Sequence, residues 1–212
     1  MNVTIIDYGI GNLRSLQKAL ETVGASVLRT DDPQRILEAE RLVLPGVGAF
    51  RACMQEIEQR GLVDPIIQAT EAGTPLLGIC VGLQLLFESS EEGGTYPGLG
   101  LIPGRVVRFP EAPPEAPDER LKIPHIGWNR IHPRHPHALF EGLPPSPYFY
   151  FVHSYHAWAE EERHVLAETR YGVSFPSAVH REHILGVQFH PEKSQRNGLQ
   201  LLRNFLHWHP YA

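Results

Sequence analysis

A single cysteine stands between two glycines in a pattern typical of a nucleophile presented at a sharp turn. Cys80 lies within Gly78-Ile79-Cys80-Val81-Gly82, between a predicted strand and a predicted helix. Glycines relieve the crowding of such a turn, and the helix would direct its N-terminal N–H groups at the thiolate. The pattern therefore indicates a cysteine nucleophile, although a structural cysteine packed at a strand end is also compatible with the motif.

A cysteine nucleophile needs a general base, and histidine is the usual one. The chain has twelve histidines, but His190 follows a predicted strand at 184–189 and lies two residues before Glu192. In an extended segment residues i and i+2 point to the same side, so Glu192 could orient the His190 imidazole. His-Pro-Glu taken alone also suits a plain turn after a strand.

A glycine cluster follows the predicted strand at 42–44. Its residues, Pro45-Gly46-Val47-Gly48, could turn backbone N–H groups into a cavity and, with the amide after Cys80, form an oxyanion hole. A plain turn between a strand and a helix is the competing interpretation. An earlier cluster at 9–12 lacks both the third glycine of a dinucleotide site and the Lys-Ser/Thr of a phosphate loop, so we reject nucleotide binding there.

The scaffold that must position these residues is indicated by alternating strand and helix patterns in the first ninety residues. Apolar runs predict strands at 3–8, 25–28, 42–44 and 75–80, and spacings of three and four predict helices at 13–23, from 31, at 50–60 and at 83–88. This order predicts an α/β fold of three layers, with a mostly parallel sheet flanked by helices.

The second half of the chain has a different composition. Ten of the nineteen prolines lie at 110–147, yet apolar residues are interleaved, which favours irregular structure packed on the domain over a linker. Further strands are expected at 148–152, 165–168 and 184–189, and a helix at 198–207. We therefore predict one domain over residues 1–212.

The composition excludes several classes of protein. Two cysteines in 212 residues cannot form a disulfide framework, and a net charge of −5 offers no broad basic surface for nucleic acid. Apolar runs are shorter than the roughly 20 residues that span a bilayer, and the first residues lack the pattern of a signal peptide. We expect a cytoplasmic protein.

Six segments, in order along almost the whole chain, resemble the class I (triad-type) glutamine amidotransferases. More closely, they resemble the glutaminase subunits of imidazole glycerol phosphate synthase. The cysteine and His-Pro-Glu motifs are shared by the whole class, whereas the first and fourth segments point to the histidine-pathway subunits. The segments are 6–13, 44–50, 78–87, 122–129, 148–155 and 186–194.

The resemblance implies a flavodoxin-like fold and hydrolysis of glutamine to glutamate and ammonia. Cys80 would attack the side-chain amide, His190 would take the thiol proton and protonate the departing ammonia, and Glu192 would orient His190. The family needs no metal and no cofactor. The oxyanion and glutamine-binding positions carried over are Gly46, Val47, Gly48, Val81, Gln84, Ser154 and Tyr155.

The resemblance also implies a partner. Ammonia would pass to a (β/α)8-barrel cyclase subunit, which converts PRFAR to imidazole glycerol phosphate and AICAR in histidine biosynthesis. The interface positions would be Asn12, Arg14, Trp128, Tyr148 and Tyr150. From the residues alone, Trp128 could belong to the core, and the two tyrosines alternate with Phe149 and Phe151 as on a half-buried strand.

Three other functions compete with this hypothesis. The first is a class I amidotransferase that serves a different acceptor synthase. The second is a cysteine hydrolase of the α/β-hydrolase type, in which the acidic residue usually precedes the histidine by many residues, whereas Glu192 follows His190. The third is a binding subunit without catalysis, which the intact set of Cys80, His190 and Glu192 disfavours.

Overall fold

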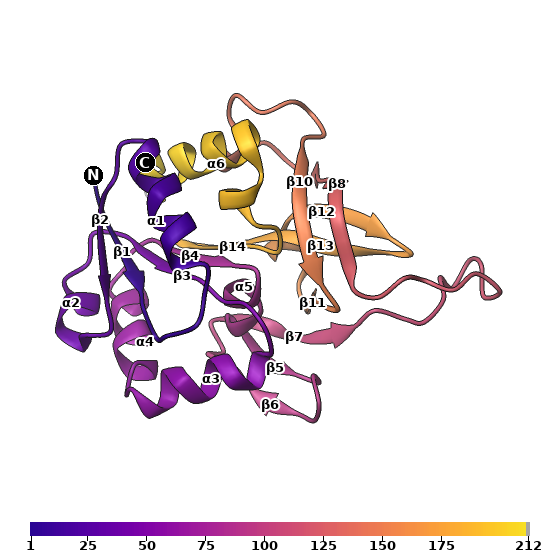
Figure 1. The fold of residues 1–212 in the computed structure, drawn as a ribbon, viewed down its shortest axis with the longest axis horizontal. Helices are drawn as coiled ribbons and strands as arrows, with labels where there is room; N and C mark the ends of the chain where they lie inside the picture. The colour runs from indigo at the N-terminus through magenta and orange to yellow at the C-terminus, as the bar shows by residue number, and fades with distance from the viewer. Residues whose placement is uncertain (211–212) are drawn as a thin grey trace.

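A mostly parallel sheet forms the centre of the molecule. The computed structural model describes residues 1–210 (Figure 1), and within them the largest sheet has eight strands in the order β2-β1-β3-β4-β14-β13-β12-β9. The first five are parallel and the last three continue the sheet in antiparallel fashion. The strands are β1 (Asn2–Ile6), β2 (Ser26–Thr30), β3 (Leu42–Leu44), β4 (Leu76–Ile79), β9 (His132–Pro133), β12 (Val165–Tyr171), β13 (Val173–Arg181) and β14 (Ile184–Val187).

Helices cover both faces of this sheet, as Figure 1 shows. One side carries α1 (Leu13–Thr22) and α6 (Gln195–His207), and the other carries α3 (Phe50–Gln59), α4 (Val63–Glu71) and α5 (Val81–Leu85), with the short α2 (Pro33–Leu37) near the β2 edge. Helix α1 buries Leu13, Leu16 and Leu20 at the predicted spacings. The predicted three-layer α/β class is confirmed.

Two smaller sheets stand beside the central one. An antiparallel ribbon pairs β8 (His125–Arg130) with β10 (Tyr148–His153). A four-stranded sheet has the order β11-β7-β5-β6, made of β11 (Tyr155–Ala159), β7 (Ile102–Arg108), β5 (Phe87–Ser90) and β6 (Tyr96–Pro97). Single 3-10 turns occur at η1 (Ala138–Phe140), η2 (Glu162–His164) and η3 (Pro191–Lys193).

Several expected elements differ from the structure. The helix predicted at 83–88 is wrong in its second half, because α5 ends at Leu85 and Phe87 begins a strand that pairs with β7. Leu85, Leu86 and Phe87 are all fully buried, and an uninterrupted apolar run fits a buried helix and a buried strand equally well. Helix α6 begins at Gln195 rather than at 198. Neither α4 nor β13 was predicted from the sequence.

The proline-rich region is only partly irregular. It contains β8, β9 and η1 as well as a loop at 110–121 that extends away from the molecule (Figure 1). Within residues 1–210, no helix is long and apolar enough to cross a membrane.

The strand directions place the candidate site. Cys80 follows β4, Pro45 follows β3, and the segment leading to His190 follows β14. Because the carboxyl ends of parallel strands share one edge of a sheet, residues from three distant parts of the sequence meet there.

Candidate active site

Cys80 occupies a strained turn, the nucleophile elbow, at the junction of β4 and α5. Its backbone has φ 56° and ψ −111°, a conformation that L-residues rarely adopt. Gly82 lets this turn lie against β3, because a Cβ atom at position 82 would stand 1.9 Å from the Leu44 carbonyl oxygen. A non-glycine residue held in such a conformation is a frequent property of functional sites.

His190 and Glu192 form a hydrogen-bonded pair in which both side chains are buried. The His190 Nδ1 atom lies 2.8 Å from Glu192 Oε1. The expected reason for this contact was wrong, because the pair does not lie on an extended segment. His190 precedes the 3-10 turn η3, and the two side chains meet across that turn. Asn12 Nδ2 donates to the same carboxylate oxygen at 3.4 Å.

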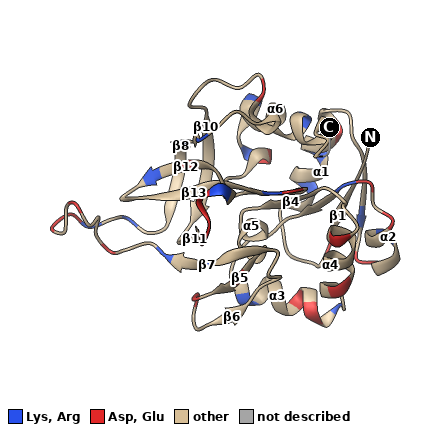
Figure 2. Ribbon diagram, turned by 180° about the vertical axis from the view of Figure 1, so that it is seen from behind, with Lys and Arg blue, Asp and Glu red and all other residues tan. Residues whose placement is uncertain are grey.

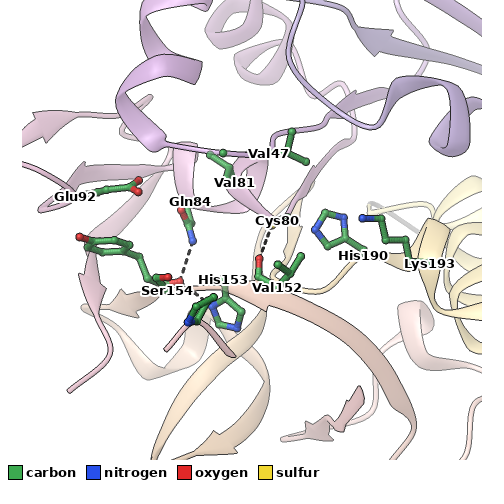
Figure 3. Close-up of a pocket in the computed structure, with 13 residues that line it drawn as sticks. Val47, Cys80, Val81, Gln84, Glu92, Val152, His153, Ser154, His190 and Lys193 are labelled. Atoms are coloured by element: carbon green, nitrogen blue, oxygen red, sulfur yellow. Dashed lines mark hydrogen bonds between the residues drawn. The ribbon is translucent and has the colours of Figure 1, made fainter. Parts of the chain in front are cut away.

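The surroundings of His190 favour its protonated form. Burial lowers its pKa, but the Cys80 thiol and the Glu192 carboxylate raise it and prevail, giving a pKa of about 10. Nδ1 faces Glu192, and Nε2 has no hydrogen-bond partner within the described residues. Figure 3 shows the ring beside Cys80. The arrangement can therefore hold a thiolate opposite an imidazolium.

A cavity of about 340 Å³ brings most of the candidate residues together. Among the expected oxyanion and glutamine positions, Gly46 alone does not line it and instead packs against the elbow, where an added Cβ would lie 2.7 Å from Gly82 N. The cavity is lined by Val47, Gly48, Cys80, Val81, Gln84, Glu92, Pro124, Val152, His153, Ser154, Tyr155, His190 and Lys193 (Figure 3).

Several residues in or beside the cavity were not predicted from the sequence, among them Glu92 and Gln188. Glu92 lines it and accepts a hydrogen bond from Phe50 N, at the start of α3, at 2.7 Å. Gln188 is fully buried, and its Oε1 accepts from Gln84 Nε2 at 3.2 Å while its Nε2 lies 3.8 Å from Cys80 Sγ. Only the position of Gln188 two residues before His190 could have drawn attention to it.

Comparison with known proteins identifies the family. The family model for "Glutamine amidotransferase class-I" matches residues 4–208. The chain belongs to this family. The family match also removes the α/β-hydrolase alternative, because it covers nearly the whole chain.

Relatives within the class I amidotransferases are more specific. A protein of Salinibacter ruber named imidazole glycerol phosphate synthase subunit HisH is 60% identical, over 95% of this chain and 92% of the relative. The protein of the same name from Syntrophotalea carbinolica is 53% identical, over 96% of this chain and 98% of its own. The amidotransferase is thus a member of the HisH family.

Solved structures support the fold. A crystal structure described as a glutamine amidotransferase superposes with a TM-score of 0.73 at 23% identity and covers 96% of each chain. Another glutamine amidotransferase, from Thermotoga maritima, superposes with a TM-score of 0.66 at 15% identity, covering 97% of this chain and 96% of the other. At these identities the likeness establishes the class I amidotransferase fold alone.

The contact between Gln188 and Cys80 in the amidotransferase leads to a prediction. Gln84 holds the Gln188 oxygen, so the Gln188 amide nitrogen is directed at the sulfur. A hydrogen-bond donor stabilises a thiolate, and loss of one hydrogen bond of about 1 kcal/mol lowers the fraction of thiolate roughly fivefold. We expect Gln188→Leu to slow alkylation of Cys80 by iodoacetamide about fivefold at neutral pH. Gln200→Leu, on α6, is the matched control, and equal rates in both variants would contradict the prediction.

A one-way chain of hydrogen bonds supports the wall of the cavity. Asn129 Nδ2 lies 3.2 Å from His125 Nε2, His125 Nδ1 lies 3.0 Å from His153 Nε2, and His153 Nδ1 lies 2.8 Å from the Tyr155 carbonyl oxygen. Asn129 Oδ1 accepts from Arg130 N, which fixes the orientation of the amide. Each histidine therefore accepts at Nε2 and donates at Nδ1.

Both histidines in this series of hydrogen bonds, His125 and His153, are held in the neutral form. Burial lowers the pKa of His125 to about 4, and it lowers the pKa of His153 well below the ordinary value. The Tyr155 carbonyl oxygen, the last acceptor in this series of hydrogen bonds, also accepts a hydrogen bond from Gln84 Nε2 at 3.0 Å. The position of the cavity wall is thus tied to two uncharged imidazoles.

The expected interface residues fall into two places. On the β8–β10 ribbon, Trp128 pairs with Tyr150, and Trp128 and Tyr148 remain 47% and 46% exposed. The predicted alternation is confirmed, since Phe149 and Phe151 are fully buried. In Figure 2 the ribbon carries little charge, whereas acidic residues mark α3 and α4.

The other two expected interface residues lie on the α1 side of the site. Arg14 is exposed on α1, whereas Asn12 immediately precedes that helix and contacts Glu192. Asn12 therefore belongs to the surroundings of the candidate triad as well as to the expected interface. Within residues 1–210, no three His, Cys, Asp or Glu side chains are grouped so as to hold a metal ion.

Proposed function

We propose that this amidotransferase hydrolyses L-glutamine to glutamate and ammonia, with Cys80 as nucleophile, His190 as proton carrier and Glu192 as the group that orients His190. The observation that carries the proposal is the elbow at Cys80, which shares one cavity with His190, while His190 Nδ1 lies 2.8 Å from Oε1 of the buried Glu192. The three residues supply a nucleophile, a base and its orienting group in one amidotransferase domain at 1–212.

The reaction follows in two steps. The Cys80 thiolate attacks the side-chain carbonyl carbon of glutamine, and the N–H groups of Val47 and Val81 stabilise the resulting oxyanion. The C–N bond then breaks, and His190 gives its proton to the departing ammonia. His190 next takes a proton from water as the water attacks the thioester, glutamate leaves, and the thiolate opposite an imidazolium is restored.

Substrate recognition is assigned to the end of the cavity that is opposite His190. Glu92 is the acidic residue that lines it, so its carboxylate suits the α-ammonium group of glutamine. Gln84 and the backbone of Ser154 and Tyr155 would bind the polar groups of the same ligand. Reaction without metal or cofactor is part of the proposal.

The ammonia is proposed to reach a second subunit rather than bulk water. The relatives are named as subunits of imidazole glycerol phosphate synthase, so we assign as partner the (β/α)8-barrel cyclase that converts PRFAR to imidazole glycerol phosphate and AICAR. Exposed aromatic side chains are frequent interface anchors. Lys193 lines the cavity and its Nζ lies 5.8 Å from the Tyr150 ring centre, which joins the ribbon to the cavity.

The docking surface for the cyclase would comprise two parts, the ribbon and the start of α1. Its residues would be Trp128, Tyr148 and Tyr150 on the ribbon, and Asn12 and Arg14 at the start of α1. A cytoplasmic location is part of the proposal, since both cysteines are free thiols. The alternative to the cyclase is a different acceptor synthase, which would receive ammonia made by the same glutaminase chemistry.

A comparison of two tryptophan variants tests the partner. We expect the purified cyclase and its nucleotide to stimulate glutaminase activity at least tenfold, and Trp128→Ala to remove most of that stimulation while basal hydrolysis stays within twofold. Trp158→Ala is the matched control, because Trp158 is 45% exposed on β11, outside the ribbon. Absence of stimulation of the wild type would overturn the cyclase assignment, and glutaminase activity without cyclase would still support the chemistry.

A further inference from the structure

Two buried side chains hold the backbone of the loop that follows β3. The Tyr8 hydroxyl donates to the Pro45 carbonyl oxygen at 2.6 Å. The Cys53 thiol donates to the Val47 carbonyl oxygen, with sulfur and oxygen 3.5 Å apart. Tyr8 and Cys53 are fully buried, and neither has a part in the proposed chemistry. Both contacts therefore act on the backbone of the loop.

The two contacts flank a single peptide unit. Pro45 O belongs to the peptide before Gly46, and Val47 O belongs to the peptide after Val47. The peptide between them carries Gly46 O and Val47 N–H, and within residues 1–210 no hydrogen bond engages either group. Because each peptide is planar, fixing the planes on both sides restricts the orientations that are open to the middle plane.

The middle peptide lies next to the nucleophile. Gly46 packs so closely on the elbow that an added Cβ would lie 2.9 Å from Val81 Cβ, and Val47 lines the cavity together with Cys80. Burial raises the pKa of the Tyr8 hydroxyl and of the Cys53 thiol, so both groups keep the protons that they donate at neutral pH. The loop is thus held from the interior at the point where an oxyanion would form.

We propose that Tyr8 and Cys53 are positioning residues that fix the Pro45 and Val47 carbonyls and so set the direction of the Val47 N–H relative to Cys80. The proposal rests on the proposed glutaminase function, in which Val47 N–H stabilises the oxyanion. A donor that is already oriented lowers the barrier of the chemical step without contributing to ground-state binding of glutamine.

The test compares three variants in the presence of the cyclase. Tyr8→Phe and Cys53→Ala each remove one donor, and we expect kcat to fall about 5- to 20-fold with KM within twofold. Cys53→Ser keeps a donor at nearly the same place, and we expect it to recover most of the lost kcat. Tyr171→Phe is the matched control, because it loses a hydroxyl bond of similar kind, to the Lys122 carbonyl, away from the loop.

Two further measurements separate positioning from simple destabilisation. The rate at which iodoacetamide alkylates Cys80 needs no oxyanion hole, so we expect it to be unchanged in Tyr8→Phe and Cys53→Ala. Hydrogen exchange of the buried Gly46 amide should be at least tenfold faster in these variants than in the wild type, because a loosened loop exposes that amide to water. Unchanged kcat, or a rise in KM with no recovery in Cys53→Ser, would overturn the proposal.

The exchange measurement also distinguishes this proposal from the proposed function. If the wild type fails to hydrolyse glutamine with the cyclase present, the proposed function fails. Exchange of the Gly46 amide still decides whether Tyr8 and Cys53 hold the loop, and equal exchange in wild type and variants would refute that role on its own.

Discussion

Replacement of Cys80 by alanine is expected to lower glutamine hydrolysis by about 10⁴-fold or more, because no other group in the cavity can form the thioester. The variant should fold, since Ala keeps the small volume of the buried side chain. Glutaminase activity with the cyclase present is the measurement. Activity within tenfold of the wild type would show that Cys80 is not the nucleophile.

A glycine variant at the same position separates catalysis from backbone strain. Cys80→Gly should be as inactive as Cys80→Ala but more stable by roughly 1 kcal/mol, because φ 56° with ψ −111° suits glycine better than any L-residue. Urea unfolding of the two inactive variants measures the difference. A glycine variant less stable than the alanine variant would contradict the presence of strain.

The second large effect is expected at Glu192. A glutamine there keeps the shape of the side chain but removes its charge, and removal of the orienting carboxylate in such a triad costs on the order of 10²- to 10⁴-fold in kcat. The activity should also change its response to pH. With the pKa of His190 at about 10, the imidazolium that protonates ammonia persists through neutral pH and is lost above about pH 10.

The pH profile of kcat/KM tests the second part of this prediction. In Glu192→Gln the Cys80 thiol is the remaining group that raises the pKa of His190, so the alkaline limb should move to lower pH by at least one unit. Glu56→Gln, a change on the exposed side of α3, should leave the limb in place. A limb that does not move in Glu192→Gln would mean that Glu192 does not control His190.

The predicted positions of Cys80 and His190 followed from the strand ends, because parallel strands bring their carboxyl ends to one edge whatever the details of the helices. The contact between His190 and Glu192 was expected for the wrong reason: the sequence shows Pro191 between them but not that a 3-10 turn begins there. Local spacing alone does not distinguish the two geometries.

Other parts of the site depend on contacts between residues far apart in the chain. Glu92 was missed because the segment before it was expected to be helical and is the strand β5. In the sequence Tyr8 and Cys53 look like ordinary core residues, and their bonds to Pro45 and Val47 arise from packing between β1, α3 and the loop. Such bonds have no signature in the spacing of residue types.

The chain of His125 and His153 has a consequence for the conditions under which the protein works. Free imidazoles gain charge near pH 6.5, but burial keeps these two uncharged well below that value. A fall of the pH toward 6 therefore adds no positive charge to these two side chains. The electric field that they exert on a zwitterionic ligand in the cavity stays constant. Richness in histidine here insulates the pocket from acidity instead of making it an acid sensor.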